Sequence, residues 1–138
     1  MKGFLLDTNI VSELRKPKPH GAVLAWFQSL SPEHMFLPAV VLGELHMGAD
    51  LTRKQDPAKA LELDTWIDQI AGTYSVLPMD TACFREYARL MHGRSSDLSE
   101  DAMIAATARV HRLTVATRNV RDFFPFGVPL FNPFSPKP

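Results

Sequence analysis

Four acidic residues in this chain of 138 residues are candidates for binding a metal ion: Asp7, Glu44, Asp101 and Asp122. No cluster of Cys or His residues accompanies them, so a metal ion held there would have only oxygen ligands. Hard divalent cations such as Mg²⁺ and Mn²⁺ prefer such sites, whereas zinc prefers nitrogen and sulfur. A Mg²⁺ ion held by few carboxylates keeps several water molecules and can activate one of them to attack a phosphate. These residues therefore predict metal-dependent hydrolysis of a phosphate ester.

The apolar run that begins at Gly3 and ends at Asp7 is too short for a helix and predicts a buried strand. Ligands of an open α/β sheet bind in the crevice beyond the carboxyl ends of its strands, which places Asp7 at the expected active edge. Asp7 could instead serve only as the N-cap of the helix that follows. Its interpretation as a site residue depends on whether other acids reach the same edge.

Glu44 stands on one stripe of an expected helix, with Val41, Leu45 and Gly48 at the other positions of that stripe. A carboxylate in an apolar stripe is unfavourable unless it is paired or binds a metal ion. The other interpretation is an edge position from which the carboxylate reaches solvent. Gly48 is unfavourable in a helix interior, and we expect it to allow the close approach of a neighbouring element.

Asp101 and Asp122 lie on either side of an expected buried strand over residues 114–117. Asp101 falls in the first turn of an alanine-rich helix, where the helix dipole favours a negative charge. Asp122 belongs to the polar segment that begins at Thr117, where the strand stops. If the strands are parallel, their carboxyl ends share one edge, and these acids reach that edge independently of Asp7.

Short apolar segments alternate with amphipathic segments along the whole chain. This alternation predicts a parallel sheet that is covered by helices on both faces. We expect an α/β fold, a three-layer α/β/α domain with a central parallel sheet of four or five strands over residues 1–132, and a proline-rich C-terminal tail over residues 133–138. Further strands are expected at 34–37, 74–77 and 128–131; helices at 9–14, 21–30, 38–50, 57–71, 80–91 and 99–108; and a polar loop at 51–57.

The composition is that of an ordinary folded protein, with 46% hydrophobic and 22% charged residues. The formal net charge is zero, so a polyanionic partner would have to be met by a local patch of Lys and Arg. Such residues are also exposed routinely on surfaces without any partner. The candidates for such a phosphate-binding patch are Arg15, Lys16, Lys18, Arg118 and Arg121.

The single cysteine, Cys83, cannot form an internal disulfide, which suits a reducing cytosol. No basic and apolar leader precedes the first strand, and no apolar run approaches the length of a membrane span. We therefore expect a soluble, cytoplasmic protein that does not contact a membrane.

Taken together, these residues resemble the PIN-domain ribonucleases, and among them the VapC toxins of bacterial toxin–antitoxin pairs. The matching pieces span almost the whole chain in family order: Leu5-Leu6-Asp7-Thr8-Asn9, Glu44 in its helix, Asp101-Ala102-Met103-Ile104-Ala105-Ala106-Thr107-Ala108, and Thr117-Arg118-Asn119-Val120-Arg121-Asp122-Phe123. The resemblance implies a Mg²⁺-dependent endoribonuclease, with Mn²⁺ as a substitute, that leaves a 5′-phosphate and a 3′-hydroxyl. It also implies a VapB-type antitoxin as partner, contact with operator DNA only through that antitoxin, and a homodimer.

Carried onto this chain, the family pattern implies that Asp7 and Asp101 are the principal metal ligands and that Glu44 is the third acid. Thr8 and Thr117 would orient water or phosphate through their hydroxyl groups. These roles are implied by the resemblance and need the fold to bring the five side chains together.

The fourth site residue is open between two positions. Many PIN domains have an aspartate where this chain has Asn119, and Asp122 follows three residues later. This departure from the family pattern favours one tightly bound ion and a weaker one whose binding is assisted by the substrate.

Two other functions fit parts of the same pattern. A phosphohydrolase of the haloacid-dehalogenase type also has an aspartate after its first strand, but it needs a second aspartate two residues later, where this chain has Asn9. The third candidate is a catalytically idle domain that acts as a partner or corepressor in an antitoxin–DNA complex. The RNA target itself has no readable motif, because RNA specificity lies in loop shape and single-stranded contacts.

Overall fold

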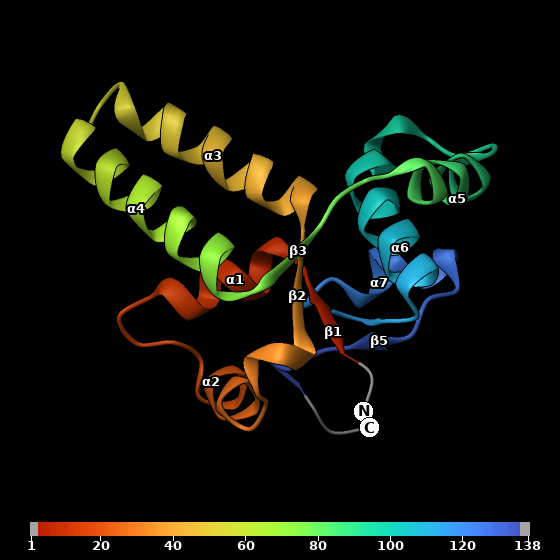
Figure 1. Ribbon diagram of the computed structural model, residues 1–138, viewed down its shortest axis with the longest axis horizontal. Coiled ribbons are helices and arrows are strands. Elements are labelled where there is room, and N and C mark those ends of the chain that lie inside the picture. Colours follow the sequence, from red (N-terminus) through yellow and green to blue (C-terminus); the bar gives the residue numbers. More distant parts are fainter. Residues whose placement is uncertain (1–2, 136–138) are drawn as a thin grey trace.

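A computed structural model describes residues 3–135 of the chain. Five short strands form one parallel sheet in the order β3-β2-β1-β4-β5 (Figure 1). The strands are β1 (Phe4–Leu6), β2 (Met35–Pro38), β3 (Ser75–Leu77), β4 (Thr114–Ala116) and β5 (Leu130–Phe131). The prediction of a central parallel sheet flanked by helices is confirmed, with five strands.

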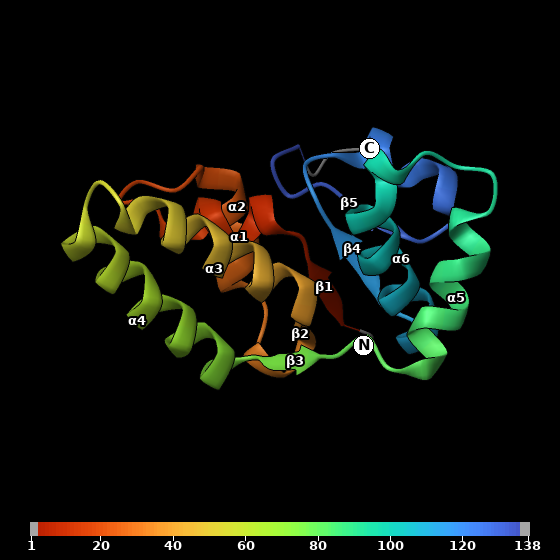
Figure 2. The same cartoon turned by 90° about the horizontal axis from the view of Figure 1, so that it is seen from above.

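Helices connect each strand to the next. They are α1 (Thr8–Arg15) and α2 (Gly21–Gln28) after β1, α3 (Ala39–Arg53) and α4 (Pro57–Thr73) after β2, α5 (Thr81–Met91) and α6 (Ser99–His111) after β3, and α7 (Val120–Phe123) after β4. Short 3₁₀ helices lie at Pro32–His34, Ser96–Leu98 and Phe124–Phe126. Figures 1 and 2 show α3 and α4 packed side by side at one end of the molecule, and α5 and α6 packed together at the other end.

The strand order determines where a ligand can bind. From β1 the chain moves outward to β2 and β3, and then returns to β4 on the opposite side of β1. Because crossovers between parallel strands are right-handed, helices before and after this reversal cover opposite faces of the sheet. The two sets of helices therefore separate above the carboxyl ends of β1 and β4, and this crevice is the expected binding site of such a sheet.

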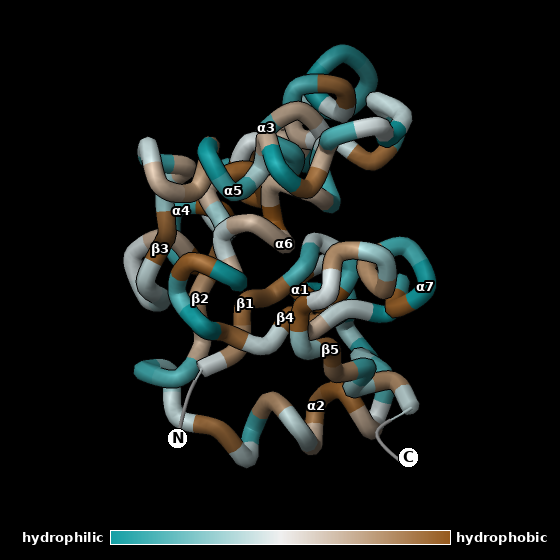
Figure 3. The backbone as a smooth tube through the Cα atoms, turned by 90° about the vertical axis from the view of Figure 1, so that its right-hand side faces the viewer, coloured by the Kyte–Doolittle hydropathy of each residue, from teal (hydrophilic) through white to brown (hydrophobic). Residues whose placement is uncertain are grey.

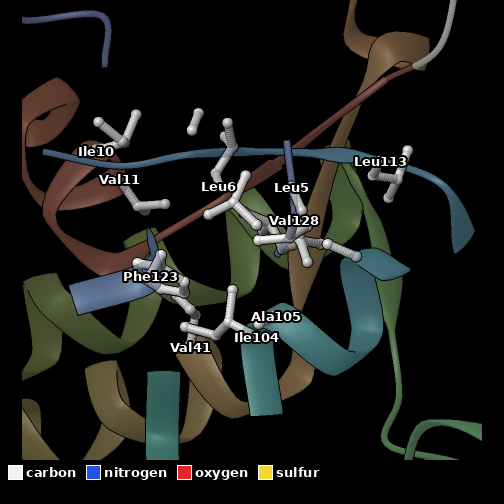
Figure 4. Close-up of a cluster of buried hydrophobic side chains, with 14 of the residues drawn as sticks. Leu5, Leu6, Ile10, Val11, Val41, Ile104, Ala105, Leu113, Phe123 and Val128 are labelled. Carbon is white, nitrogen blue, oxygen red and sulfur yellow. The ribbon is translucent and has the colours of Figure 1, made fainter. Parts of the chain in front are cut away.

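The hydrophobic core lies between the sheet and the helices that cover it. Figure 4 shows Leu5 and Leu6 of β1 near Ile104 of α6 and Phe123 of α7, and each of these side chains is at most 1% exposed. Burial of one large apolar side chain contributes about 1.5–3 kcal/mol. In Figure 3 the backbone tube is hydrophobic along β1 and hydrophilic around the outer turn that carries α7. This packing fixes the strand ends from which the site residues project.

The third helix differs from the sequence expectation. It continues to Arg53, so the predicted loop at 51–57 begins three residues later, and Pro38 is the last residue of β2 rather than part of the helix. Gly48 is exposed with no atom within 4 Å of an added Cβ, so the expected close approach at this glycine is wrong. The buried positions of α3 are Val41, which belongs to the central core cluster, and Ala49.

The C-terminal segment is packed as far as the structure describes it. Pro133 is buried, and Asn132 Oδ1 accepts a hydrogen bond of 2.9 Å from the backbone N–H of Phe134. Residues 136–138 of the predicted tail lie outside the described residues. Within residues 3–135, none of the helices is both long enough and apolar enough to span a bilayer.

Candidate active site

Asp7 is both the N-cap of α1 and the most buried acid at the crevice. Its Oδ1 accepts the backbone N–H of Thr8 at 2.8 Å. Its Oδ2 accepts the Thr117 hydroxyl at 2.7 Å and the Asn9 side-chain amide at 3.2 Å. The carboxylate is thus held from β1, α1 and the end of β4, and only 6% of Asp7 is exposed. The capping role and the site role are therefore compatible.

The electrostatics of Asp7 reflect this position. Burial raises the pKa of its carboxyl, hydrogen bonds from Thr117 and Thr8 lower it, and the charge of Glu44 raises it. The pKa of Asp7 remains above its ordinary value. A buried carboxylate near a second acid gains most from a neighbouring cation.

Glu44 reaches the crevice from α3 although its side chain is exposed to solvent. Its Oε1 accepts a hydrogen bond of 2.5 Å from the Thr8 hydroxyl at the start of α1. This contact joins two of the residues that the resemblance assigns to the site. The expectation that Glu44 occupies an edge position with access to solvent fits the structure.

Glu100 is a site residue that the sequence analysis did not identify. Hydrogen bonding with Glu44 raises its pKa to about 7, with further contributions from burial and from the charges of Glu44, Asp101 and Asp7. Its Oε1 is buried without a hydrogen-bond partner, the only such side-chain atom within residues 3–135. The signal that could have revealed it is its place beside Asp101 in the first turn of α6.

Asp101 enters the same acidic cluster from the N-terminus of α6. Burial raises its pKa to about 6, and the charges of Asp7, Asp122 and Glu44 raise it as well. Asp101 therefore lies within electrostatic reach of both Asp7 from β1 and Asp122 from α7. The five acids of the crevice are Asp7, Glu44, Glu100, Asp101 and Asp122.

The two candidates for the fourth site residue occupy different places. The backbone N–H of Asn119 donates to the Thr117 hydroxyl at 2.9 Å, and its side chain is exposed and forms no cap of α7. Asp122 is also exposed but adds negative charge near Asp101. Asp122 is thus an acid near Asp101, whereas Asn119 is a neutral neighbour of Thr117.

Asn9 is a second residue whose part in the site was missed. Its side-chain N–H donates to Asp7, and its Oδ1 accepts the backbone N–H of Arg118 at 3.1 Å. Asn9 thus ties α1 to the loop after β4. An amide at this position also lacks the carboxyl that a haloacid-dehalogenase mechanism needs.

The acids fit a hard divalent cation in type but are not yet arranged as ligands. No three His, Cys, Asp or Glu side chains within residues 3–135 converge as a metal cage. Burial, followed by the charges of the neighbouring acids, raises the pKa of Asp101, and hydrogen bonding with Glu44, burial and the neighbouring charges raise that of Glu100. The unpartnered Oε1 of Glu100 and the all-oxygen donor set suit Mg²⁺ or Mn²⁺. Within the described residues these acids are therefore electrostatic neighbours that do not form a ready-made cage.

A groove of about 1030 Å³ leads to these acids between α3 and the start of α6. Glu44 and Glu100 line it together with apolar side chains, among them Val40, Met47 and Met103. A smaller apolar cavity of about 180 Å³ between α1, α2 and α4 contains no acid. The larger groove is therefore the one that can admit a substrate to the carboxylates.

The basic residues proposed for RNA contact fall into two groups. Arg15 lies over the ring of Trp66 at 5.6 Å, Lys16 pairs with Glu13 at 2.9 Å, and Lys18 is exposed. Arg15 is the last residue of α1, about 12 Å along the helix from Asp7, and Lys16 and Lys18 follow it in the chain. The second group, Arg118 and Arg121, is exposed beside the crevice.

Comparison with known proteins agrees with this geometry. The family model described as PIN domain matches residues 4–124. Toxin FitB of Neisseria gonorrhoeae is 37% identical over 95% of this chain and 98% of its own, and VapC ribonuclease Y4jK of Sinorhizobium fredii is 36% identical over 96% and 99%. The solved structure of FitAB bound to an IR36 DNA fragment aligns with a TM-score of 0.80 and 35% identity, covering 95% of each chain. On this sequence and structural similarity, the chain belongs to the PIN domain family.

Proposed function

We propose that this protein is a metal-dependent endoribonuclease toxin of the VapC type, which hydrolyses RNA phosphodiester bonds and thereby inhibits translation. The observation that carries the proposal is the convergence of Asp7, Glu44 and Asp101, from three different elements, on the crevice between β1 and β4. Relatives that match along almost the whole chain are named as a toxin and as a ribonuclease.

Asp7, Asp101 and Glu44 would hold Mg²⁺, or Mn²⁺ in its place, and Asp122 and Glu100 would complete the acidic surroundings. The bound cation supplies an activated water and neutralises charge on the phosphate. Thr117 keeps Asp7 oriented and favours its ionised form through the hydroxyl hydrogen bond. The Thr8 hydroxyl donates a hydrogen bond to the carboxylate of Glu44. Because Thr8 is the first residue of α1, the positive end of the helix dipole lies at the site.

The decisive experiment compares RNA cleavage by the wild-type chain with cleavage by Asp7→Asn and Asp101→Asn. Each change preserves shape and removes one negative charge, so we expect loss of cleavage with retained folding, and loss of cleavage by the wild type in a chelator. Asp68→Asn, at an exposed position of α4, is the matched control and should cleave normally. Full activity of either site variant would reject the assignment.

Mapping of cleavage ends across total RNA after induction identifies the target, and the products should carry a 5′-phosphate and a 3′-hydroxyl. Trapping of a phosphorylated Asp7 would instead indicate a haloacid-dehalogenase mechanism. Undetectable metal binding by calorimetry together with tight antitoxin binding would indicate a catalytically idle partner.

The proposal includes a VapB-type antitoxin as partner, with operator DNA reached only through it. It is supported by the similar FitAB structure, which is described as bound to DNA. We also infer a cytoplasmic homodimer. Exposed apolar side chains on the α3–α4 pair, Met47, Leu51 and Leu61, leave surface that a second copy could cover. Sedimentation of the isolated chain tests the dimer.

A further inference from the structure

Arg118 lies on the face of an aromatic ring rather than against a carboxylate. Its guanidinium carbon is 4.4 Å from the centre of the Phe134 ring, and the ring of His20 packs on Phe134 at 5.2 Å with a tilt of 60°. The three residues come from the loop after β4, the C-terminal segment and the loop between α1 and α2. Parts of the chain that are distant in sequence thus meet around one arginine.

The N–H groups of this guanidinium are available. Within residues 3–135, Arg118 has no carboxylate within 4.0 Å, and only its backbone N–H donates a hydrogen bond. Arg94 shows the contrast: it lies 5.2 Å from the Phe126 ring, but its guanidinium donates to the carbonyls of Leu90 and Pro125 at 2.8 and 3.3 Å. Arg94 is therefore bound within the fold, whereas Arg118 can still bind a group with several acceptor oxygens.

The backbone of Arg118 is linked to Asp7 through one intervening side chain. Its backbone N–H donates to Asn9, whose amide donates to Asp7, and the preceding residue Thr117 donates to Asp7 through its hydroxyl. The stacked guanidinium therefore projects from a backbone position that is fixed relative to the metal-binding carboxylate.

The aromatic platform is held in place by its own contacts. The turn at Asn132 binds the backbone of Phe134, and the backbone N–H of His20 donates to Glu13 at 2.8 Å. Glu13 is only 7% exposed. The backbones of Phe134 and His20 are thus both held by hydrogen bonds, and the Phe134 ring restricts the conformations that the long Arg118 side chain can adopt.

We propose that Phe134 is a positioning residue that holds the Arg118 guanidinium at the rim of the crevice, where it binds a phosphate of the RNA strand. This inference rests on the proposed function and extends it to a residue of the C-terminal segment. Stacking occupies the face of the guanidinium and leaves its planar fork of N–H groups free for bidentate contact with phosphate. Restriction of the side chain before binding also reduces the entropy that RNA binding would otherwise lose.

The test measures binding of a fluorescein-labelled single-stranded RNA of mixed sequence in the Asp7→Asn background, which prevents cleavage. We expect Phe134→Ala to weaken binding about two- to five-fold, the range that an exposed cation–π contact supports. We also expect the slope of log affinity against log salt for Phe134→Ala to approach the slope for Arg118→Ala. In Arg118→Ala that slope should be smaller than in the parent by about 0.7, the value for one lost phosphate contact. Phe134→Trp, which keeps an aromatic face, should restore both values.

Two comparisons separate positioning from a general structural role. In an Arg118→Ala background, Phe134→Ala should add no further loss, whereas equal losses with and without Arg118 would overturn the proposal. Arg94→Ala, the matched control, should bind RNA as the parent does. An unchanged salt slope in Phe134→Ala, or absence of RNA binding by the parent, would also overturn it. The proposed function is judged separately by cleavage with native Asp7, so its failure is distinguishable from failure of this contact.

Discussion

The hydroxyl of Thr117 donates a hydrogen bond of 2.7 Å to Oδ2 of Asp7 across a separation of 110 residues. The contact exists because β1 and β4 are neighbours in parallel register, with Leu6 opposite Ala116, so the residues that follow each strand stand side by side. The hydrogen bond is buried, and it stabilises the ionised form of an acid whose surroundings otherwise raise its pKa.

Replacement of Thr117 by valine should destabilise the fold and impair the site together. The change removes the hydroxyl and leaves Oδ2 of Asp7 with only the Asn9 amide. We expect the free energy of unfolding to fall by about 1–3 kcal/mol, because a buried acceptor loses a partner. RNA cleavage should fall as well. Thr117→Ser keeps the hydroxyl and should retain most of both properties in urea unfolding and cleavage assays; equal behaviour of the two variants would contradict this role.

The acidic crevice should make the metal-free protein less stable as pH rises from about 5 to 8. The pKa values of Asp101 and Glu100 are raised to about 6 and about 7, so the folded state holds protons that the unfolded state has already released. Stability therefore decreases as pH rises through these values. We expect the free energy of unfolding to fall by about 1 kcal/mol over this range. The effect is smaller than for fully buried acids because both side chains are partly exposed.

Unfolding by urea at several pH values, in a chelator and in Mg²⁺, measures this effect. The informative comparison is with Asp101→Asn and Glu100→Gln. Both variants should show a smaller decline, and saturating Mg²⁺ should reduce the decline in the wild type. A stability that rises with pH in the chelator, with the same slope in the variants, would show that the acids do not repel one another.

Much of the fold, and the position of Asp7 at the site, could be predicted from sequence. Short apolar runs alternate with amphipathic helices, and this pattern is sufficient for a parallel sheet. The position of Asp7 after the first strand is likewise sufficient to place it at the carboxyl edge. The end of α3 at Arg53 could not be predicted, because its last turn has no buried residue that would mark a helix. Instead, Arg53 forms ion pairs with Asp50 at 2.9 Å and with Asp64 at 3.0 Å.

The remaining site residues depend on tertiary contacts. Glu100 looks like a surface residue beside Asp101 until α3 brings Glu44 against it. Asn9 looks like a helix-start residue until the loop after β4 supplies Arg118 as its partner. The sequence predicts a tail from residue 133, yet Phe134 packs against His20 and Arg118. None of these relationships has a local periodicity that sequence alone could reveal.

Introduction of an aspartate at position 119 tests whether the fourth acid limits metal binding. Asn119 adjoins Thr117 at the crevice, so Asn119→Asp adds a carboxylate beside the acids already present. We expect Mg²⁺ to bind about ten-fold more tightly, because the affinity of such sites rises with the number of charged ligands. Without metal the variant should be less stable, because the added carboxylate repels the other acids. Asp122→Asn should weaken Mg²⁺ binding. Calorimetry measures both changes; unchanged affinity in Asp122→Asn would remove that residue from the site.

Relief of backbone strain at Arg112 should stabilise the protein without affecting cleavage. Arg112 caps the C-terminus of α6 with φ 57° and ψ 46°, a left-handed conformation that is unfavourable for a residue with a Cβ. Glycine adopts it without penalty and is the common residue at this position of a helix cap. Arg112→Gly should therefore raise the free energy of unfolding by about 1 kcal/mol, whereas Arg112→Ala retains the strain and should give no gain.

Activity should be unaffected by Arg112→Gly because α6 runs away from the crevice: Asp101 lies in its first turn and Arg112 follows its last. Thermal unfolding and RNA cleavage of the two variants measure stability and activity side by side. Equal stability of Arg112→Gly and Arg112→Ala would show that the cap is not strained. A loss of cleavage in the glycine variant would show instead that the far end of α6 influences the position of Asp101.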